Sequence, residues 1–300
     1  MRTAFIRELI AQAREHPDIF LVVGDLGYSV VEPFAQEFPD RFLNAGVAEQ
    51  NMTGVAAGLA SEGYHVFTYS IANFPTLRCL EQIRNDICYH GVPVTVVSVG
   101  AGLSYGNLGY SHHAVQDLGI LRTFGELTIH SPADPGEARE SVRWLTRNPG
   151  PSYLRLGKAG EPDLYPAQPL GPRPNVVHPG TADVAIAATG SVLKCALEAA
   201  AFLRCDGLDP AVLSCPWLQP LGTEFAAVFQ AYRRVLTVEE HVASGGLGSL
   251  MKELLPRSVA VESLTIPLPV TRMVGSQSFL RREAGLDGPA IAAALKRLAT

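Results

Sequence analysis

Hydrophobic residues fall into short continuous runs, separated by segments in which they recur every three or four positions. The clearest runs are 20–23, 65–69, 93–99 and 152–156, and each predicts a buried strand. Helical spacing occupies 4–15, 76–90, 115–123 and 134–148. Strands that alternate with helices favour a parallel sheet covered on both faces.

The pattern lapses after Gly157 and returns near Ala182. Prolines at 162, 166, 169, 172, 174 and 179 indicate an extended linker. A second alternating block follows, with strands expected near 182–188, 211–213 and 234–238 and helices over 191–205 and 289–299. The sequence therefore predicts two α/β domains, residues 1–160 and 181–300, joined by a linker over 161–180.

Composition narrows the class of protein. The 300 residues are 47% apolar and 18% charged, and the net charge of -5 with no basic block argues against a nucleic-acid partner. No apolar run reaches the roughly 18 residues of a membrane span, and the start lacks a signal-peptide core. The five cysteines form no C-x-x-C pair, which favours buried, reduced thiols in a cytoplasmic protein.

Candidate chemistry follows the ends of the predicted strands. These features are Gly24-Asp25, residues 69–74, residues 100–113, and Arg155 within its own strand. Because ligands bind at the carboxyl ends of parallel strands, we expect these features to gather at one edge of the sheet.

Glu49 is the most distinctive acidic residue. It stands just before the small and apolar run 53–60, which predicts a helix buried on all sides. A carboxylate sheltered at the mouth of that helix favours a shared or retained proton, which suits an enzyme that exchanges protons with a bound heterocycle. Alternatively, Glu49 is an ordinary acid in the first turn of a helix.

The other candidates each have two interpretations. Phe74 follows a strand and either stacks on a flat ligand or packs in the core. His113 and Asp117 have the spacing of two ligands on one helix face, although Asp117 also fits a first-turn acid. Arg155 in its apolar strand needs either a phosphate or a buried partner. The glycine turn 244–248 either binds an anion or is structural.

The segment Asn44-Ala-Gly-Val-Ala-Glu-Gln-Asn-Met52 resembles the glutamate motif of the transketolase family of thiamine diphosphate enzymes. The resemblance continues through 69–74 and 109–113 and covers nearly the whole chain. It implies a parallel-sheet pyrimidine-binding domain followed by a smaller transketolase C-terminal domain. It also implies that Glu49 hydrogen-bonds the aminopyrimidine and activates the cofactor, that Phe74 stacks on that ring, and that His112 handles substrate protons.

The resemblance assigns further residues to the site. Ile71 and Asn73 match the pyrimidine pocket, and Asp25 matches an acid near the cofactor where two subunits meet, although a turn aspartate is the simpler interpretation. Positions that bind the sugar phosphate are matched by Arg2, Ser29 and Arg155. In contrast, Gly100 and Leu108 stand where many members carry a histidine and an aspartate. Pentose phosphates are therefore in doubt as substrates, and a deoxy sugar or a nucleotide-linked sugar is an alternative.

The chain lacks the diphosphate-binding pattern of the family. Gly24-Asp25-Leu26 has no third glycine and no trailing asparagine, so we predict no metal site. The resemblance implies one subunit of a split transketolase, whose partner carries the N-terminal diphosphate domain and Mg²⁺, in an α2β2 heterotetramer. Such an enzyme transfers a two-carbon ketol unit from a sugar or sugar-phosphate donor to an aldehyde. The alternatives are the beta subunit of a 2-oxoacid dehydrogenase and a non-catalytic scaffold.

Overall fold

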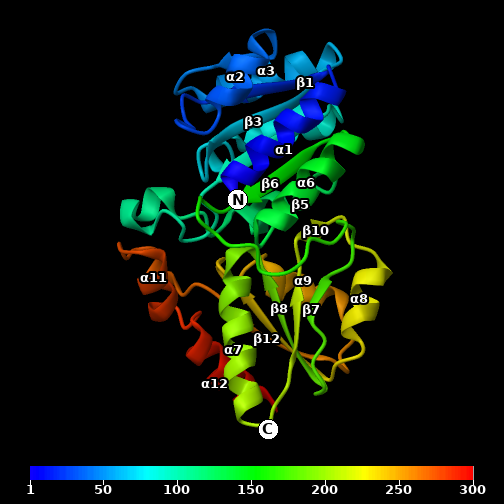
Figure 1. Ribbon diagram of the computed structural model, residues 1–300, viewed down its shortest axis with the longest axis vertical. Coiled ribbons are helices and arrows are strands. Elements are labelled where there is room, and N and C mark those ends of the chain that lie inside the picture. The colour runs from blue at the N-terminus through cyan, green and yellow to red at the C-terminus, as the bar shows by residue number, and fades with distance from the viewer. Residues whose placement is uncertain (300) are drawn as a thin grey trace.

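The computed structural model describes residues 1–299, which form two stacked domains (Figure 1). The first domain has a seven-stranded sheet of order β10-β5-β6-β4-β3-β1-β2. All neighbours in it are parallel except β10, which pairs antiparallel with β5. Its strands are β1 (Ile19–Val23), β2 (Phe42–Asn44), β3 (His65–Ile71), β4 (Val94–Val99), β5 (Thr128–His130), β6 (Ser152–Leu156) and β10 (Trp217–Gln219). The predicted parallel sheet is confirmed.

Helices cover both faces of this sheet because successive strand residues point to opposite sides. Leu21 and Val23 pack toward α1 (Arg2–Glu15) and α6 (Pro135–Arg147), whereas Phe20 and Val22 pack toward α3 (Glu49–Ser61). The α3 face also holds η2 (Leu77–Cys79), α4 (Leu80–Gln82), the π-helical η3 (Ile83–Tyr89) and α5 (Asp117–Leu121). The short α2 (Glu32–Glu37) and η1 (Pro39–Arg41) connect β1 to β2.

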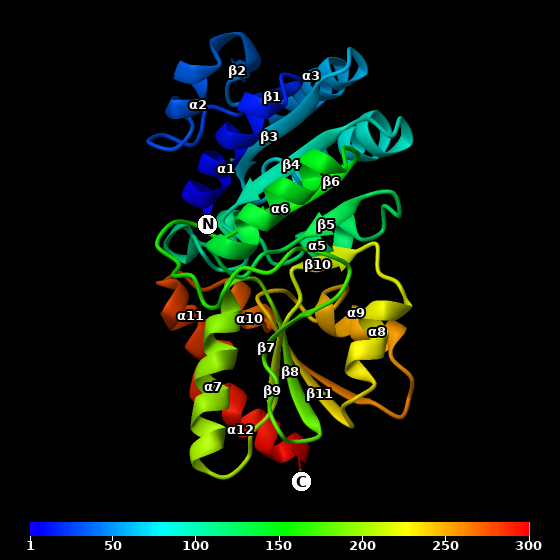
Figure 2. The ribbon, with the colours of Figure 1, turned by 45° about the vertical axis from the view of Figure 1, so that its right-hand side comes forward.

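The second domain has a five-stranded sheet of order β12-β11-β8-β9-β7. Its strands are β7 (Asn175–His178), β8 (Val184–Thr189), β9 (Ala211–Ser214), β11 (Arg234–Glu239) and β12 (Ala260–Leu264). One face is covered by α7 (Leu193–Cys205) and α12 (Gly288–Ala299), and the other by α8 (Thr223–Phe229) and α9 (Leu247–Leu254) (Figure 2). The remaining elements are η4 (Gly106–Leu108), η5 (Tyr110–His112), η6 (Gly190–Val192), α10 (Leu268–Thr271) and α11 (Gln277–Glu283).

Strands lie within and across the segment expected to link the domains. Within the expected linker 161–180, residues 175–178 form β7, which pairs antiparallel with β9 at the edge of the second sheet. In the other direction, β10 leaves the second half of the chain and joins the first sheet. One apolar cluster contains Ile129 and Tyr153 of the first sheet together with Phe225 of α8. The two domains therefore share a core.

The helix that begins at Glu49 was expected to be buried on all sides, and this was wrong for the single chain. Met52, Ala56 and Ala60 are buried against the sheet. The opposite face is exposed, and it carries Gln50, Asn51, Gly54 and Gly58. Four of the five cysteines are buried as expected, but Cys205 is exposed.

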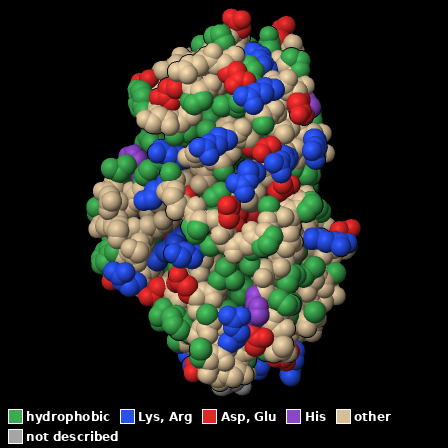
Figure 3. Space-filling model, viewed as in Figure 1, with side chains coloured by type: hydrophobic (Ala, Val, Ile, Leu, Met, Phe, Trp, Pro, Cys, Tyr) green, Lys and Arg blue, Asp and Glu red, His purple; other side chains and the backbone are tan. Residues whose placement is uncertain are grey.

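Charges of both signs lie side by side over α1 and α6 (Figure 3), where Arg143 donates to Glu8 at 2.9 Å. No helix within residues 1–299 is long and apolar enough to cross a membrane.

Candidate active site

Glu49 is the first residue of α3 and is 2% exposed. It lies against the ends of two adjacent parallel strands, β1 and β3. A Cβ placed on Gly24, just after β1, would stand 3.6 Å from Glu49 Cγ and 3.4 Å from Ser70 Oγ of β3. The absence of a side chain at Gly24 thus lets the Glu49 side chain lie close to the backbone. This position is at the carboxyl ends of the strands, where parallel sheets bind ligands.

The carboxylate of Glu49 has a cationic partner that sequence reasoning missed. Arg78 Nη1 of η2 donates to Glu49 Oε2 at 2.6 Å, while Ser70 Oγ approaches the other oxygen at only 3.5 Å. The Glu49 side chain is 1% exposed, but that of Arg78 is 47% exposed. An arginine in a predicted helix is typical of a solvated residue, so the sequence carried no signal for this contact.

Phe74 and His112 extend the cluster away from Glu49. The Cζ atom of Arg78 lies 4.9 Å from the centroid of the Phe74 ring, within the range of a cation–π contact. The imidazole of His112 meets Phe74 edge-on, with centroids 5.3 Å apart. Glu49, Arg78, Phe74 and His112 therefore form one continuous group drawn from three separate segments of the chain.

The His112 imidazole is half-buried, and its Nδ1 lies 3.0 Å from Ser111 Oγ. Partial burial, followed by the neighbouring charge of His113, lowers the pKa of His112 below its ordinary value. Both effects favour the neutral imidazole near pH 7, a form that can accept a proton.

Asn73 and Ile71 support this group. Asn73 Nδ2 donates to the carbonyl oxygens of Ser111 at 3.2 Å and His113 at 2.9 Å, so it ties the loop after β3 to the loop that carries His112. Ile71 ends β3 beside Val99 of β4 and is half-buried. The backbone at Ala72 has φ 33°, a left-handed conformation that turns the chain sharply between them.

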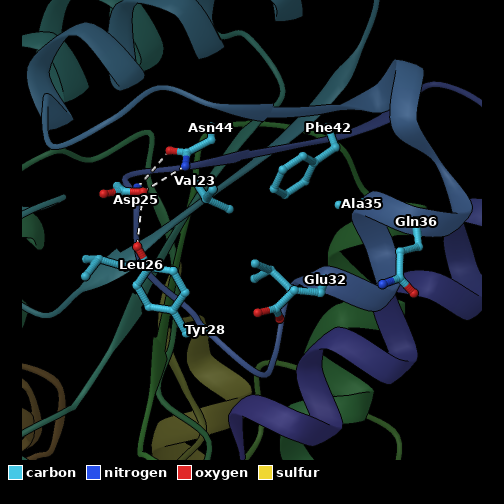
Figure 4. A pocket seen from close by; sticks show the side chains of 10 residues that line it. Val23, Asp25, Leu26, Tyr28, Glu32, Ala35, Gln36, Phe42 and Asn44 are labelled. Carbon is cyan, nitrogen blue, oxygen red and sulfur yellow. Dashed lines mark hydrogen bonds between the residues drawn. The ribbon is translucent and has the colours of Figure 1, made fainter.

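Asp25 lies beside a cavity of about 340 Å³ at the ends of β1 and β2 (Figure 4). Asn44 Nδ2 donates to Asp25 Oδ1 at 2.9 Å, and Asn44 Oδ1 accepts from the Asp25 backbone N–H at 3.0 Å. The Tyr28 hydroxyl donates to the same carboxylate at 3.4 Å. Asp25 adopts φ 56°, as the turn interpretation describes, and the residue also lines the cavity.

The two other phosphate candidates near the amino terminus lie in different settings. Ser29 is exposed with φ 63°, and its backbone N–H donates to Glu32 Oε1 at 2.7 Å. Arg2 is half-buried beside Tyr105. Burial raises the pKa of the Tyr105 phenol, and the charge and hydrogen bond of Arg2 oppose that rise. The buried Arg2 Nε has no hydrogen-bond partner within the described residues.

Arg155 does not face a cavity. Its side chain is 2% exposed and forms an ion pair with Asp117, whose Oδ2 accepts from Arg155 Nε at 2.7 Å. Arg155 Nη2 donates to the carbonyl oxygens of Ala114 at 2.6 Å and Glu240 at 3.1 Å. This arrangement contradicts the expectation that Arg155 binds a substrate phosphate, because the guanidinium is enclosed by protein partners.

The same geometry contradicts a metal site at His113 and Asp117. Asp117 is the first residue of α5, as the helix-acid interpretation required, but its carboxylate is committed to Arg155 and Tyr153. His113 Nδ1 lies 2.9 Å from the carbonyl oxygen of Thr271, a contact between the two domains. Among residues 1–299, no group of three or more His, Cys, Asp or Glu side chains is arranged to hold a metal ion.

The glycine turn of the second domain is structural. The backbone N–H groups of Leu247 and Gly248 donate to the carboxylate of Glu239 at 2.6 and 2.8 Å. Glu239 ends β11 and is fully buried. The first turn of α9 therefore already has an internal carboxylate, and these donors are not available to an external anion.

Comparison with known proteins places this geometry in a family. The profile of "Transketolase, pyrimidine binding domain" matches residues 1–160, and that of "Transketolase, C-terminal domain" matches residues 175–291.

The chain belongs to the transketolase family.

Its relatives in this family include chains of similar length and longer proteins. It is 36% identical over 273 residues to a protein of Phocaeicola vulgatus that is named as one subunit of an apulose-4-phosphate transketolase, covering 89% of the chain and 87% of the relative. It is 34% identical over 305 residues to 1-deoxy-D-xylulose-5-phosphate synthase 1 of Geobacter sulfurreducens, covering 97% of the chain but 47% of that longer protein.

A solved structure supports the fold. The chain superimposes on a protein titled split gene transketolase, inactive beta4 tetramer, with a TM-score of 0.87 and 33% identity. The match covers 99% of this chain and 96% of the other. The two-domain transketolase architecture is therefore shown for this chain, as expected from the resemblance.

Two loop positions that the resemblance singled out have different surroundings. Gly100 has φ 103°, and an added Cβ would strike the Tyr105 ring, which leaves no room for a side chain. Leu108 is 56% exposed. The loop between β4 and α5 is therefore built around Tyr105.

The residues present fit the aminopyrimidine end of thiamine diphosphate. A buried carboxylate, an adjacent aromatic ring and a nearby neutral imidazole can bind, orient and exchange protons with a flat nitrogen heterocycle. The transketolase family implies this cofactor, and Glu49, Phe74 and Ile71 are the side chains that would contact its ring.

Proposed function

We propose that this chain is the pyrimidine-binding subunit of a split, thiamine diphosphate-dependent transketolase that transfers a two-carbon ketol unit to an aldehyde acceptor. The observation that carries the proposal is the buried carboxylate of Glu49 in one group with Phe74 and His112. When bound, the cofactor supplies a nucleophilic carbon that can hold the transferred fragment.

In this proposal the chain itself binds, orients and exchanges protons. Glu49 hydrogen-bonds a ring nitrogen of the aminopyrimidine and so controls where its proton resides. Phe74 and Ile71 present apolar surface to the ring, while Asn73 fixes the loop of His112. His112, with its lowered pKa, accepts a substrate proton near neutral pH. Asp25 lies at the same sheet edge and faces the partner.

A partner subunit completes the site in this proposal. The relatives that match over most of their length are named as subunits or sections of transketolases, and the longer synthase contains this region as less than half of its length. We infer that the partner carries the N-terminal diphosphate domain and holds Mg²⁺, and that the active form is an α2β2 heterotetramer.

The substrate is inferred to be a phosphorylated sugar. Arg2 offers a buried Nε with no partner among the described residues, and Ser29 stands exposed after β1. Guanidinium and hydroxyl donors suit a phosphate group. The Phocaeicola relative is named for apulose 4-phosphate, which supports a phosphorylated substrate.

The decisive experiment replaces Glu49 with glutamine in the complex reconstituted with its diphosphate-binding partner. Exchange of the thiazolium C2 hydrogen with deuterium, followed by NMR, reports cofactor activation without knowledge of the substrate. Removing a positioned proton donor is expected to slow this exchange by roughly 10²- to 10⁴-fold.

Glu62→Gln is the matched control, because Glu62 is an exposed acid at the other end of α3. Exchange in the Glu49→Gln complex at the wild-type rate would refute the role of Glu49. Release of carbon dioxide from a 2-oxoacid would favour the dehydrogenase alternative instead. Absence of thiamine diphosphate binding by calorimetry would favour the scaffold alternative.

A further inference from the structure

Arg78 occupies both contacts that the proposed site offers to an aminopyrimidine. Its guanidinium donates to Glu49 Oε2 at 2.6 Å and lies over the Phe74 ring at 4.9 Å. A bound heterocycle is expected to use the same carboxylate and the same aromatic surface. We propose that Arg78 is an internal stand-in for the cofactor, which must be displaced when the cofactor binds; this inference rests on the proposed function.

The chemistry of the guanidinium and the aminopyrimidine explains why one can occupy the position of the other. A guanidinium is a planar N–C–N unit that donates hydrogen bonds from its edge and stacks through its face. The aminopyrimidine is also flat and has an amidine-like edge of nitrogen atoms. A site built from a carboxylate and an aromatic ring can therefore bind either group. Because there is one Glu49 carboxylate and one Phe74 ring, the site favours a single occupant at a time.

The position of Arg78 allows it to leave. Its side chain is 47% exposed, so the guanidinium can move into solvent without opening the core. The residue lies in the single turn of η2, whose backbone is held separately by the bond from the Arg78 N–H to the carbonyl of Asn73 at 3.4 Å. Side-chain rotation is thus sufficient, and the backbone that carries Phe74 and Asn73 need not move.

Charge balance also favours displacement. Glu49 is buried, so its carboxylate needs a partner while the site is empty, and Arg78 supplies one. Once the cation leaves, a buried carboxyl group is best stabilised by a proton that it can share with a ring nitrogen. Arg78 therefore keeps the empty site charge-balanced, and its departure prepares Glu49 for the proton exchange assigned to it.

The test measures the affinity of the reconstituted complex for thiamine diphosphate by calorimetry. Removal of the competing ion pair and cation–π contact in Arg78→Gln is expected to tighten binding by roughly 3- to 30-fold. Arg78→Lys keeps the charge but loses the flat stacking group. Its affinity for thiamine diphosphate should therefore lie between those of the wild type and Arg78→Gln. Arg84→Gln is the matched control, because Arg84 is exposed and donates to neighbouring Asn85.

A second measurement separates competition from a general change in structure. Millimolar guanidinium chloride added to an Arg78→Ala complex should weaken thiamine diphosphate binding, because the free ion refills the vacated position. Affinity that is unchanged or weaker in Arg78→Gln, or insensitive to guanidinium in Arg78→Ala, would overturn this inference. A wild-type complex that does not bind thiamine diphosphate at all would instead overturn the proposed function.

Discussion

At the scale of single residues, a buried ion pair joins Asp117 to Arg155. Both side chains are almost fully enclosed, and Tyr153 donates to the same carboxylate at 2.6 Å. Burial by itself would raise the pKa of Asp117, but the charges of Arg155 and His241 and the hydrogen bonds from Arg155 and Tyr153 hold it below its ordinary value. The carboxylate is therefore ionised at neutral pH.

Replacing Asp117 with alanine is expected to destabilise the protein by about 3–5 kcal/mol, because Arg155 would stay buried without a counter-charge. Urea unfolding followed by circular dichroism measures the change. Glu37→Ala is the control, since it breaks the solvent-exposed pair with Arg14 and should leave the unfolding midpoint nearly unchanged. A small effect for Asp117→Ala would show that water or a rearrangement compensates Arg155.

At the scale of residues, the sequence predicts that side chains after parallel strands gather at one edge of the sheet. Phe74 and His112, from the segments after β3 and β4, lie in contact, and Arg78 links Phe74 to Glu49. Arg78 and the partner of Arg155 could not be predicted in this way. Each pairing joins residues far apart in the sequence, Arg78 to Glu49 and Asp117 to Arg155, and the choice among possible partners is made only by the folded chain.

At the scale of elements, Glu239 of β11 fixes the start of α9. Its carboxylate accepts from the Leu247 and Gly248 N–H groups, which favours ionisation, but desolvation outweighs both bonds and raises the pKa of Glu239 to about 7. A Cβ on Gly246 would collide with the Glu239 carboxylate, so the turn requires glycine there.

The raised pKa of Glu239 determines how its contribution to the free energy of unfolding changes with pH. The unfolded chain releases this proton near pH 4.5 and the folded chain near 7, so the contribution of Glu239 to stability is present below about pH 4.5 and is lost as pH rises through 7. Glu239→Gln cannot ionise, but its amide nitrogen cannot accept from either backbone N–H, so it should be less stable than the wild type at pH 4.5. That deficit should shrink by pH 8, as the wild type loses the contribution of Glu239. Urea unfolding at both pH values measures the difference.

Glu239→Ala provides the comparison for that variant. It removes the acceptor entirely and leaves buried N–H groups at the start of α9 unpaired, which is expected to cost about 1–3 kcal/mol. A constant difference between the glutamine variant and the wild type across this pH range would show that Glu239 does not titrate there.

Element prediction succeeded for strands buried on both faces but did not find every strand at a sheet edge. The pattern located β1, β3, β4 and β6, whose residues are all or nearly all buried. It missed β7, which lies among prolines, and β10, which follows Pro216 and precedes Pro220. Pairing of β10 with β5 depends on a contact between the two halves of the chain, which local periodicity cannot reveal.

At the scale of the whole molecule, the site opens beside apolar surface that the single chain leaves uncovered. Val47, two residues before Glu49, is 75% exposed, and Tyr28 beside the Asp25 cavity is 70% exposed. Exposed apolar residues that gather at a site often mark an interface. Together with the exposed face of α3, they fit the proposal that a diphosphate-binding partner closes over Glu49.

Val47→Asp tests this arrangement without touching the fold. Val47 makes little contact within the chain, so the variant should unfold like the wild type, yet a charge placed in a buried interface should weaken association with the partner by roughly tenfold or more. Val176→Asp is the matched control, because Val176 is 42% exposed on β7 of the second domain. Association measured by analytical ultracentrifugation should fall for Val47→Asp alone. Equal association of both variants would place the partner on another surface. The partner could then not bind the diphosphate of a cofactor whose pyrimidine lies at Glu49.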